Sequence, residues 1–181
     1  VLDHDEGIRA QVTAEDLAAL KPAFKADGKV TAGNSSQIGD GAAALLVASE
    51  EKAAQLGLEP LARVHALAAA AVDPVTVLTG HVPATERVLE RAKVVVEDID
   101  AFEIDEAFAS VVLAWQAELH GDMDRVNVNG GAIALGNPLG CSGARLMTTL
   151  VHQLARTGGR YGLQAMCGGG GVANATVVER L

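Results

Sequence analysis

The chain has 181 residues, of which 49% are apolar and only 3% are aromatic. Its 14 basic and 23 acidic residues give a net charge of -9, which opposes binding to polyanions, and so few aromatic rings argue against a nucleic-acid-binding surface. The length suffices for one well-packed core, or for one domain plus part of another, and we expect the second arrangement.

The first 60 residues are predicted to contain short helices and one strand. Thr13 and Asp16 form a capping-box pattern for a helix that Pro22 ends or kinks. The segment 31–36 opens a second helix, predicted to run on through small residues from position 39 before a buried apolar strand at 45–47. A lone apolar strand leaves backbone groups unpaired. We therefore expect the first 60 residues to be incomplete without neighbours.

A short helix follows, with Ser49 as its cap and Gly57 at its end. From residue 61 onward, predicted strands alternate with predicted helices. The strands cover 62–71, 102–105, 126–129, 161–167 and 172–179, and the helices cover 83–92, 106–120 and 142–156. Strands separated by helices of this length form βαβ units. The fold class is therefore α/β: a three-layer α-β-α domain with helices on both faces of a mostly parallel mixed sheet.

Two glycine-rich stretches stand out near the end of the chain, at 127–145 and at 166–171. Cys167 ends an apolar strand and is followed by four glycines, whose backbone N–H groups are not screened by a Cβ. A thiol at this position is usually a small buried hydrophobe. Exposed amides beside the sulfur at a strand end indicate instead a ligand site, where acyl chemistry is possible.

Cys141 and Cys167 lie far apart in the sequence, and the histidines show no metal-ligand spacing, so we expect no metal. We find no signal peptide and no run of 18 apolar residues, which predicts no membrane association and a reducing cytoplasm. A disulfide between the two cysteines is the alternative.

The stretches 127–145 and 166–171, together with 31–36 and 106–109, resemble the thiolase family of acyl-CoA acyltransferases. The resemblance runs from about Asp5 to the end of the chain in the family's order. It covers only the second half of a thiolase and lacks the half with the nucleophilic cysteine. It implies three parts: residues 1–37 from the tail of the loop region, 38–60 from the end of the N-terminal domain, and 61–181 as the C-terminal domain.

The resemblance also implies roles. Cys167 is the acid/base cysteine that moves a proton on and off the α-carbon of the substrate, and the Gly169 N–H donates to the thioester oxyanion. The residues implied to contact substrate or coenzyme A are Arg9, Ala32, Ser36 and Phe108. Coenzyme A thioesters are then substrates, and no cofactor is needed. The family forms dimers and tetramers, so we expect an oligomer and a missing N-terminal half as partners.

Two positions depart from the family. Asn137 stands where the family has a histidine, and Asp105 stands where asparagine is common. A neutral amide donates to an oxyanion but accepts no proton near neutral pH. One hypothesis is that Asp105 hydrogen-bonds the Asn137 amide and has partly taken over the base role; the alternative is an engineered change or drift toward low activity.

Three functions remain open at this point. The chain is one piece of an acyltransferase, inactive by itself; a non-catalytic CoA-ester binding module; or a structural subunit of a thiolase-like complex. The changes at Asn137 and Asp105 favour the second, and the incomplete first 60 residues favour the third.

Overall fold

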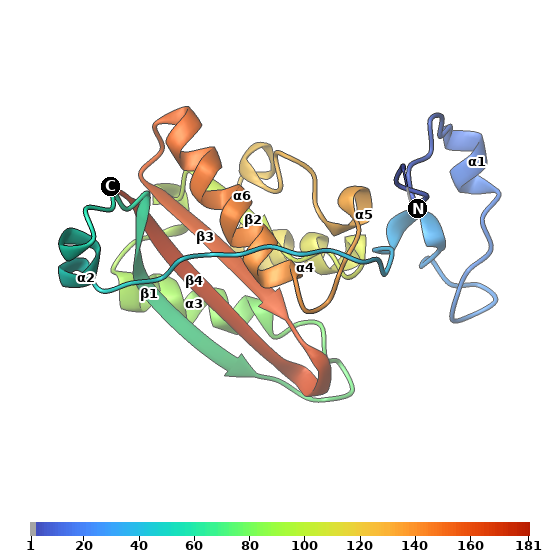
Figure 1. Cartoon of the computed structure of the whole chain (residues 1–181). Coiled ribbons are helices and arrows are strands. Elements are labelled where there is room, and N and C mark those ends of the chain that lie inside the picture. The colour runs from blue at the N-terminus through green and yellow to red at the C-terminus, as the bar shows by residue number, and fades with distance from the viewer. Residues whose placement is uncertain (1–2) are drawn as a thin grey trace.

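Four strands form one mixed sheet, in the order β1-β4-β3-β2, in a computed structural model that describes residues 3–181 (Figure 1). The strands are β1 (Ala62–Ala71), β2 (Ala101–Ile104), β3 (Tyr161–Cys167) and β4 (Val172–Arg180). β2 and β3 are parallel, whereas β4 pairs antiparallel with both β1 and β3. The expectation that parallel pairing would predominate is therefore corrected. The reason is the glycine turn 168–171, which reverses the chain between β3 and β4.

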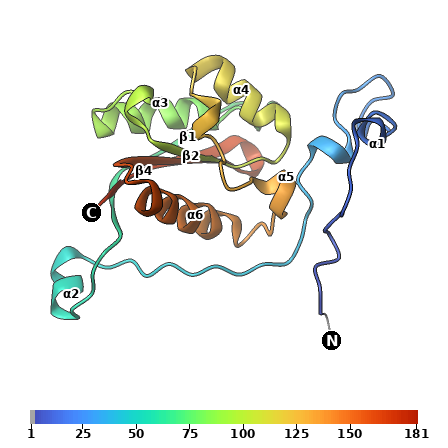
Figure 2. The same ribbon diagram turned by 90° about the horizontal axis from the view of Figure 1, so that it is seen from above.

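Helices cover both faces of the sheet. On one face lie α3 (His81–Ala92) and α4 (Ala109–Leu119), and on the other lies α6 (Ser142–Thr157), as Figure 2 shows. This arrangement confirms the predicted three-layer α/β class. The shorter elements of this part are η2 (Val96–Asp98), η3 (Met123–Arg125), α5 (Ala132–Leu135) and η4 (Gly169–Gly171). Among residues 3–181, no helix is long and apolar enough to cross a bilayer.

The core follows from the alternation of side chains along β2. Phe102 and Ile104 pack with the residues of α3 and α4, where the rings of Phe102 and Trp115 meet edge to face with centroids 5.0 Å apart. On the opposite face, Leu150 and Leu154 of α6 pack in a second, smaller cluster. Removal of these side chains from water stabilises the domain by roughly 2 kcal/mol each.

The predicted strand at 126–129 is wrong. Val126 makes only an isolated parallel bridge to Phe102, and Asn127 has a φ of 48°, which ends any strand at that point. The Asn127 side chain continues the ladder in its place: its Oδ1 accepts from the Ile104 N–H at 2.8 Å, and its Nδ2 donates to the Ile104 carbonyl at 2.9 Å. A side-chain amide thus pairs the edge of β2.

The N-terminal part contains α1 (Ala14–Ala18), η1 (Ala32–Asn34) and α2 (Glu50–Gln55). The capping box of Thr13 and Asp16 is confirmed, as is the cap of α2 by Ser49. The helix predicted from residue 31 is only the single 3-10 turn η1, because its Thr31 cap and Asn34 close the hydrogen bonds within one turn.

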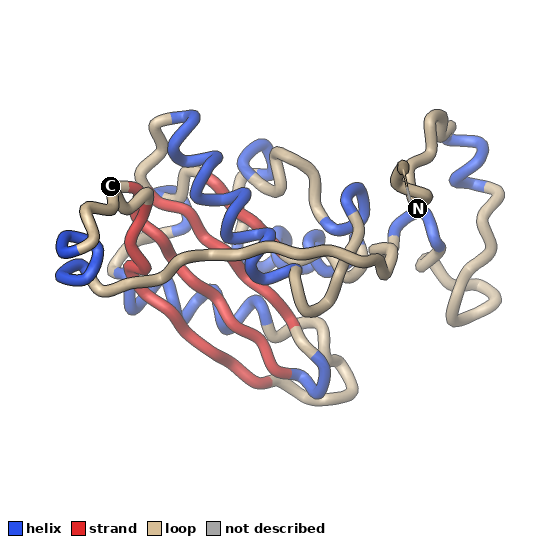
Figure 3. The backbone as a smooth tube through the Cα atoms, viewed as in Figure 1, coloured by secondary structure: helices blue, strands red, loops and turns tan. Residues whose placement is uncertain are grey.

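Residues 37–48 run as one long extended segment between η1 and α2 (Figure 3). The helix and the buried strand predicted here are both wrong, since Leu46 and Val47 are 81% and 79% exposed. Apart from the bond between Asn137 and Gln37, no backbone hydrogen bond holds this segment to another part of residues 3–181. An apolar strand sequence without strand neighbours stays extended and exposed.

Candidate active site

The two reactive side chains predicted from the sequence lie at one edge of the sheet. β2 and β3 are parallel, so their carboxyl ends meet at the same edge, where ligands bind in open α/β sheets. Asp105 directly follows β2, and Cys167 is the last residue of β3. The Asp105 N–H donates to the Ala165 carbonyl at 3.0 Å, which extends the ladder by one residue toward the thiol.

Cys167 is half-buried and carries a free thiol. Burial and, to a lesser extent, the charge of Asp105 raise the pKa of this thiol to about 11, against an opposing effect of a backbone hydrogen bond. The thiol is therefore protonated at neutral pH. The charge of Asp105 thus acts on the thiol across the edge of the sheet that the two residues share.

Asp105 is 6% exposed. Burial raises the pKa of its carboxyl, the Arg145 guanidinium lowers it, and Glu106 raises it again. Its Oδ1 is buried and has no hydrogen-bond partner within residues 3–181. A carboxylate in this state is costly, and it shares its surroundings with a cation from α6.

In the glycine turn that follows Cys167, the last two residues have a left-handed backbone conformation that favours glycine. Gly170 and Gly171 have φ values of 75° and 82°, and a Cβ on Gly171 would lie 2.5 Å from the Val72 carbonyl oxygen. Gly169 borders open space, because a Cβ built there would meet no atom within 4 Å. Its backbone is accessible beside the thiol, as the predicted oxyanion donor requires.

Asn137 is 5% exposed and tightly held. Its N–H donates to the Gln37 carbonyl at 2.7 Å, its Nδ2 donates to Ser36 Oγ at 3.3 Å, and its Oδ1 accepts from Ser142 Oγ at 2.5 Å. The predicted hydrogen bond between the Asn137 amide and Asp105 is not formed among the described residues. Both ends of the amide bind serines instead, so this prediction is wrong.

Ser36 and Phe108 join the segment that directly follows η1 to the start of α4. Ser36 donates to the Ala107 carbonyl through both its N–H and its Oγ, each at 3.1 Å, and Ser35 makes an antiparallel bridge to Phe108. The Phe108 ring packs edge to face on Phe24, with centroids 5.9 Å apart. The structure thus brings Ser36, Phe108 and Asn137 into one neighbourhood.

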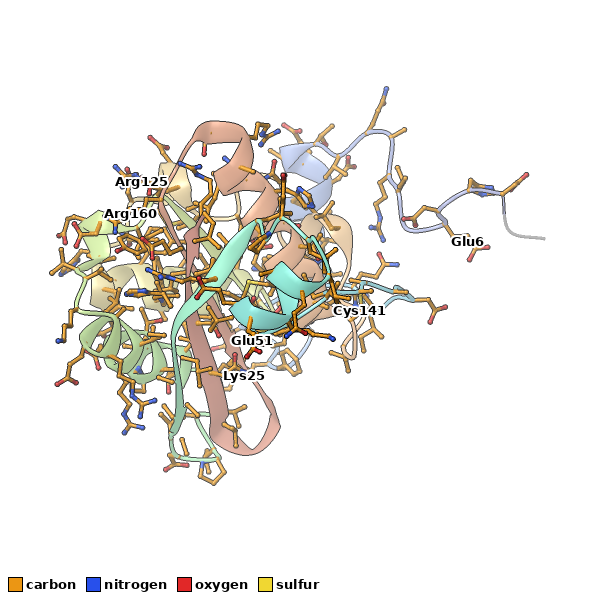
Figure 4. All side chains as sticks on the ribbon, turned by 60° about the vertical axis from the view of Figure 1, so that its left-hand side comes forward. Glu6, Lys25, Glu51, Arg125, Cys141 and Arg160 are labelled. Atoms are coloured by element: carbon orange, nitrogen blue, oxygen red, sulfur yellow. The ribbon has the colours of Figure 1, made fainter. Side chains whose placement is uncertain are left out.

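Two predicted binding residues lie outside this neighbourhood. Ala32 is the first residue of η1 and is exposed. Arg9 is exposed and makes no hydrogen bond or ion pair within residues 3–181. Figure 4 shows Glu6, three residues earlier, on a segment that projects away from the rest of the molecule. The roles of Ala32 and Arg9 stay predictions.

A cleft of about 330 Å³ lies between the extended segment 39–43 and the loop 138–141. Its lining includes Cys141 but neither Cys167 nor Asp105. This cleft is therefore not the space in front of the Cys167 thiol. No cluster of three or more metal-ligating side chains occurs in the described part of the chain.

Sequence reasoning missed three polar residues behind the site: the buried Glu103 and Gln164 and the partly buried Arg145. Glu103 and Gln164 are 2% and 5% exposed and sit opposite each other on β2 and β3. The visible signal was a charged residue between the apolar Phe102 and Ile104. Such an interruption within a buried strand indicates a buried polar group with a partner.

Comparisons with known proteins connect this geometry to one family. The family model described as "Thiolase, C-terminal domain" matches residues 58–180, and "Thiolase, N-terminal domain" matches residues 1–51. A steroid 3-ketoacyl-CoA thiolase of Mycobacterium tuberculosis is 52% identical over 98% of this chain and 43% of the relative. A 3-oxoadipyl-CoA/3-oxo-5,6-dehydrosuberyl-CoA thiolase of Escherichia coli is 50% identical over 99% of this chain and 45% of the relative.

Solved structures agree with this result. The acetyl-CoA acetyltransferase of Bacillus anthracis superimposes with a TM-score of 0.94 at 48% identity, covering 98% of this chain and 45% of that chain. Human mitochondrial 3-ketoacyl-CoA thiolase in complex with CoA gives a TM-score of 0.90 at 40% identity, with 98% and 45% coverage. The chain spans less than half the length of these relatives.

Proposed function

The chain belongs to the thiolase family, and from this premise we propose that it is the C-terminal part of an acyl-CoA acyltransferase. The complete protein would join acetyl-CoA and acyl-CoA into a 3-ketoacyl-CoA and free CoA, or would cleave the 3-ketoacyl-CoA in reverse. The observation that carries the proposal is the free thiol of Cys167, placed next to Asp105 and an open glycine backbone at the carboxyl edge of β2 and β3.

Cys167 is proposed to handle the proton at the α-carbon of the substrate. With a pKa of about 11 the thiol keeps its proton at neutral pH, which suits it to give that proton to a carbanion when the carbon–carbon bond breaks. In the synthetic direction the sulfur must first lose its proton before it takes one from the α-carbon. The accessible backbone of Gly169 is proposed to donate to the thioester oxygen.

Asn137 is proposed to donate to the second oxygen of the substrate, whereas Asp105, which only accepts hydrogen bonds when ionised, is proposed to act on the Cys167 thiol. The Asn137 amide still has one hydrogen for an oxyanion, because only one hydrogen of its Nδ2 is used by Ser36. It cannot take a proton from a nucleophile. We therefore expect the assembled enzyme to turn over more slowly than a thiolase with histidine at this position.

The remaining parts of the protein are proposed from the family. Residues 1–37 would belong to the loop region and 38–60 to the end of the N-terminal domain, and the exposed apolar segment with Leu46 and Val47 supports the second assignment. Ser36, Phe108, Ala32 and Arg9 would contact the coenzyme A thioester. The missing N-terminal half, a dimeric or tetrameric assembly and a cytoplasmic location stay predictions.

Complementation tests the proposal. The chain is mixed with the part of the Bacillus anthracis acetyl-CoA acetyltransferase that it does not cover, and cleavage of acetoacetyl-CoA by CoA is followed by absorbance. We expect turnover in the mixture and none from either piece alone. Cys167→Ala should lower the rate at least about 100-fold, while the matched control Cys141→Ala should leave it unchanged. A folded complex without turnover, or equal losses in both variants, contradicts the proposal.

A second candidate is a CoA-ester binding module without catalysis. The observation that favours it is the Asn137 amide, which is held on both sides by Ser36 and Ser142 and cannot act as a base. In this case the assembled complex binds acetyl-CoA in calorimetry, and Cys167→Ala binds with the same affinity, while no cleavage occurs.

A further inference from the structure

A buried charged cluster lies directly behind the proposed site, on the face of the sheet that α6 covers. Glu103 and Asp105 are two positions apart along one strand direction, so their side chains leave the sheet on the same face. Gln164 pairs with Glu103 in the parallel register of β2 and β3. Its Nε2 donates to the Gly143 carbonyl of α6 at 3.2 Å, which shows that this face is the one under α6.

Arg145 of α6 reaches into this cluster. Its side chain is 17% exposed, yet all three guanidinium nitrogens are buried and make no direct hydrogen bond within residues 3–181. The shortest approach is 3.9 Å, from Arg145 Nη1 to Glu103 Oε2. On the facing strands, Glu103 Oε2, Asp105 Oδ1 and Gln164 Oε1 are likewise buried without a direct partner among the described residues.

The cluster thus contains six buried polar atoms without a direct partner in the described part of the chain: three nitrogens of Arg145 and one oxygen each of Glu103, Asp105 and Gln164. Burial of such atoms costs free energy unless they form hydrogen bonds. A water molecule that bridges two such polar groups makes hydrogen bonds nearly as favourable in enthalpy as a direct hydrogen bond. A bound anion does not fit, because the Arg145 guanidinium already acts on the carboxyl groups of Glu103 and Asp105. The cluster instead holds the Arg145 guanidinium as a cation among carboxyl groups.

The charge of Arg145 acts on both acids. Burial raises the pKa of Glu103 to about 7, and that of Asp105 also rises; in each case Arg145 is the group that opposes burial. A guanidinium is a permanent cation in proteins. The charge of Asp105 in turn acts on Cys167. A fixed cation on α6 is thus connected through Asp105 to the thiol on β3.

We propose that Arg145 is a positioning residue of this site: its buried guanidinium keeps Asp105 charged, and through Asp105 it sets the environment of the Cys167 thiol. The proposal rests on the function proposed above only in taking Asp105 and Cys167 as parts of the active site.

Carboxyl ¹³C NMR titration of the full 181-residue chain tests the proposal without any turnover. Glu103→Gln and Asp105→Asn assign the two signals. In Arg145→Met, the proton affinity of Asp105 and of Glu103 should rise about tenfold or more, because the opposing cation is gone. Arg145→Lys, which keeps a cation, should return the proton affinities of Asp105 and Glu103 close to those of the parent chain. Arg156→Met, on an exposed turn of the same helix, is the matched control and should change neither signal.

Titrations in Arg145→Met that coincide with those of the parent chain would overturn the proposal. If that variant does not fold, Arg145→Gln keeps the polarity and the bulk without the charge and gives the same comparison. Failure of the Met, Gln and Lys variants alike to fold would also overturn it, in favour of a purely structural role.

The complemented enzyme supplies a second readout. Arg145→Met should lower kcat with little change in KM and should move the acid limb of the pH–rate profile to higher pH, and Arg145→Lys should reverse both effects. If complementation fails while the NMR titrations shift, the proposed function fails and the link between Arg145 and Asp105 stands. If complementation succeeds and the titrations do not move, only the role of Arg145 fails.

Discussion

Asn137 is the residue at which this chain departs most from the chemistry expected of its family. It is buried, and serine hydroxyls hold both ends of its amide, from Ser36 on one side and Ser142 on the other. One of these hydroxyls could hold one nitrogen of an imidazole, since a hydroxyl both donates and accepts, and the other nitrogen would then be free to accept a proton. The surroundings of residue 137 are therefore suited to histidine as well as to asparagine.

Asn137→His should increase the rate of acetoacetyl-CoA cleavage in the complemented enzyme by about 10² to 10⁴, because it restores a general base. Asn137→Gln is the matched control, since it keeps an amide and gains no base. Steady-state kinetics at pH 8 measures both. Equal rates for the His and Gln variants would show that residue 137 is not where the proton is taken.

The thiol of Cys167 responds to Asp105. Because the charge of Asp105 raises the pKa of the thiol, Asp105→Asn should lower that pKa and increase the thiolate fraction below pH 10. In a Cys141→Ser background, alkylation of Cys167 by iodoacetamide at pH 8 should become about three- to tenfold faster.

The pH profile of alkylation separates this effect from simple exposure. A lowered thiol pKa moves the midpoint of the profile, whereas a looser structure raises the rate equally at all pH values. A profile with an unmoved midpoint would mean that Asp105 and Cys167 do not interact as described.

At the scale of elements, α6 does more than cover the sheet. Its C-terminal half packs Leu150 and Leu154 in the apolar cluster, while its N-terminal half faces the site with Ser142 and Arg145. One helix therefore has an apolar C-terminal half and a polar N-terminal half. Its placement along the sheet decides how Arg145 meets the two carboxylates.

The C-terminal end of α6 allows a test of how this helix is terminated. Gly158 has a φ of 77°, and its N–H donates to the Leu154 carbonyl at 2.9 Å, which is a left-handed C-cap. Gly158→Ala should lower the free energy of unfolding by about 1 kcal/mol, because alanine is strained in this region.

Gly140→Ala is the matched control for that variant. A Cβ at Gly140 would meet no atom within 4 Å, and its φ lies outside the left-handed region. The midpoint of urea unfolding of Gly140→Ala should be close to that of the parent chain or slightly higher. Equal losses at positions 140 and 158 would contradict the assignment of Gly158 as the cap.

On the scale of the whole molecule, the chain divides into a sheet domain and a part that the sheet does not hold. The buried residues of the two core clusters all lie after residue 67, whereas Ile38, Leu46 and Val47 are more than three-quarters exposed. Exposed apolar segments of this kind mark surfaces that another chain segment covers. The family's N-terminal half is the proposed cover.

Limited trypsin digestion tests this division. Lys52 in α2 should be cut early, whereas Arg145 and Arg156 in α6 should be protected, which leaves a stable product beginning at Ala53 as measured by mass spectrometry. Addition of the complementing N-terminal piece should slow the cut at Lys52. Early cuts within α6 would show that the sheet domain is not stable by itself.

Much of this protein could be predicted from local sequence. The α/β class, strands β1, β3 and β4, helix α6 and the capping box at Thr13 follow from periodicity and short-range hydrogen bonds. The position of Cys167 at the end of a strand, beside open glycines, also followed from sequence. These features depend on residues close to one another in the chain, so a single sequence contains the information that fixes them.

Other features depended on contacts between distant segments. The glycine turn 168–171 makes β3 and β4 antiparallel. The Asn127 side chain, and not a strand at 126–129, bonds the edge of β2. Asn137 bonds Ser36, which lies 101 positions away, and not Asp105. The cluster of Glu103 and Arg145 likewise forms only when α6 packs on the sheet. Sequence determined which residues are available, and tertiary packing decided which of them meet, because burial and charge act through space and not along the chain.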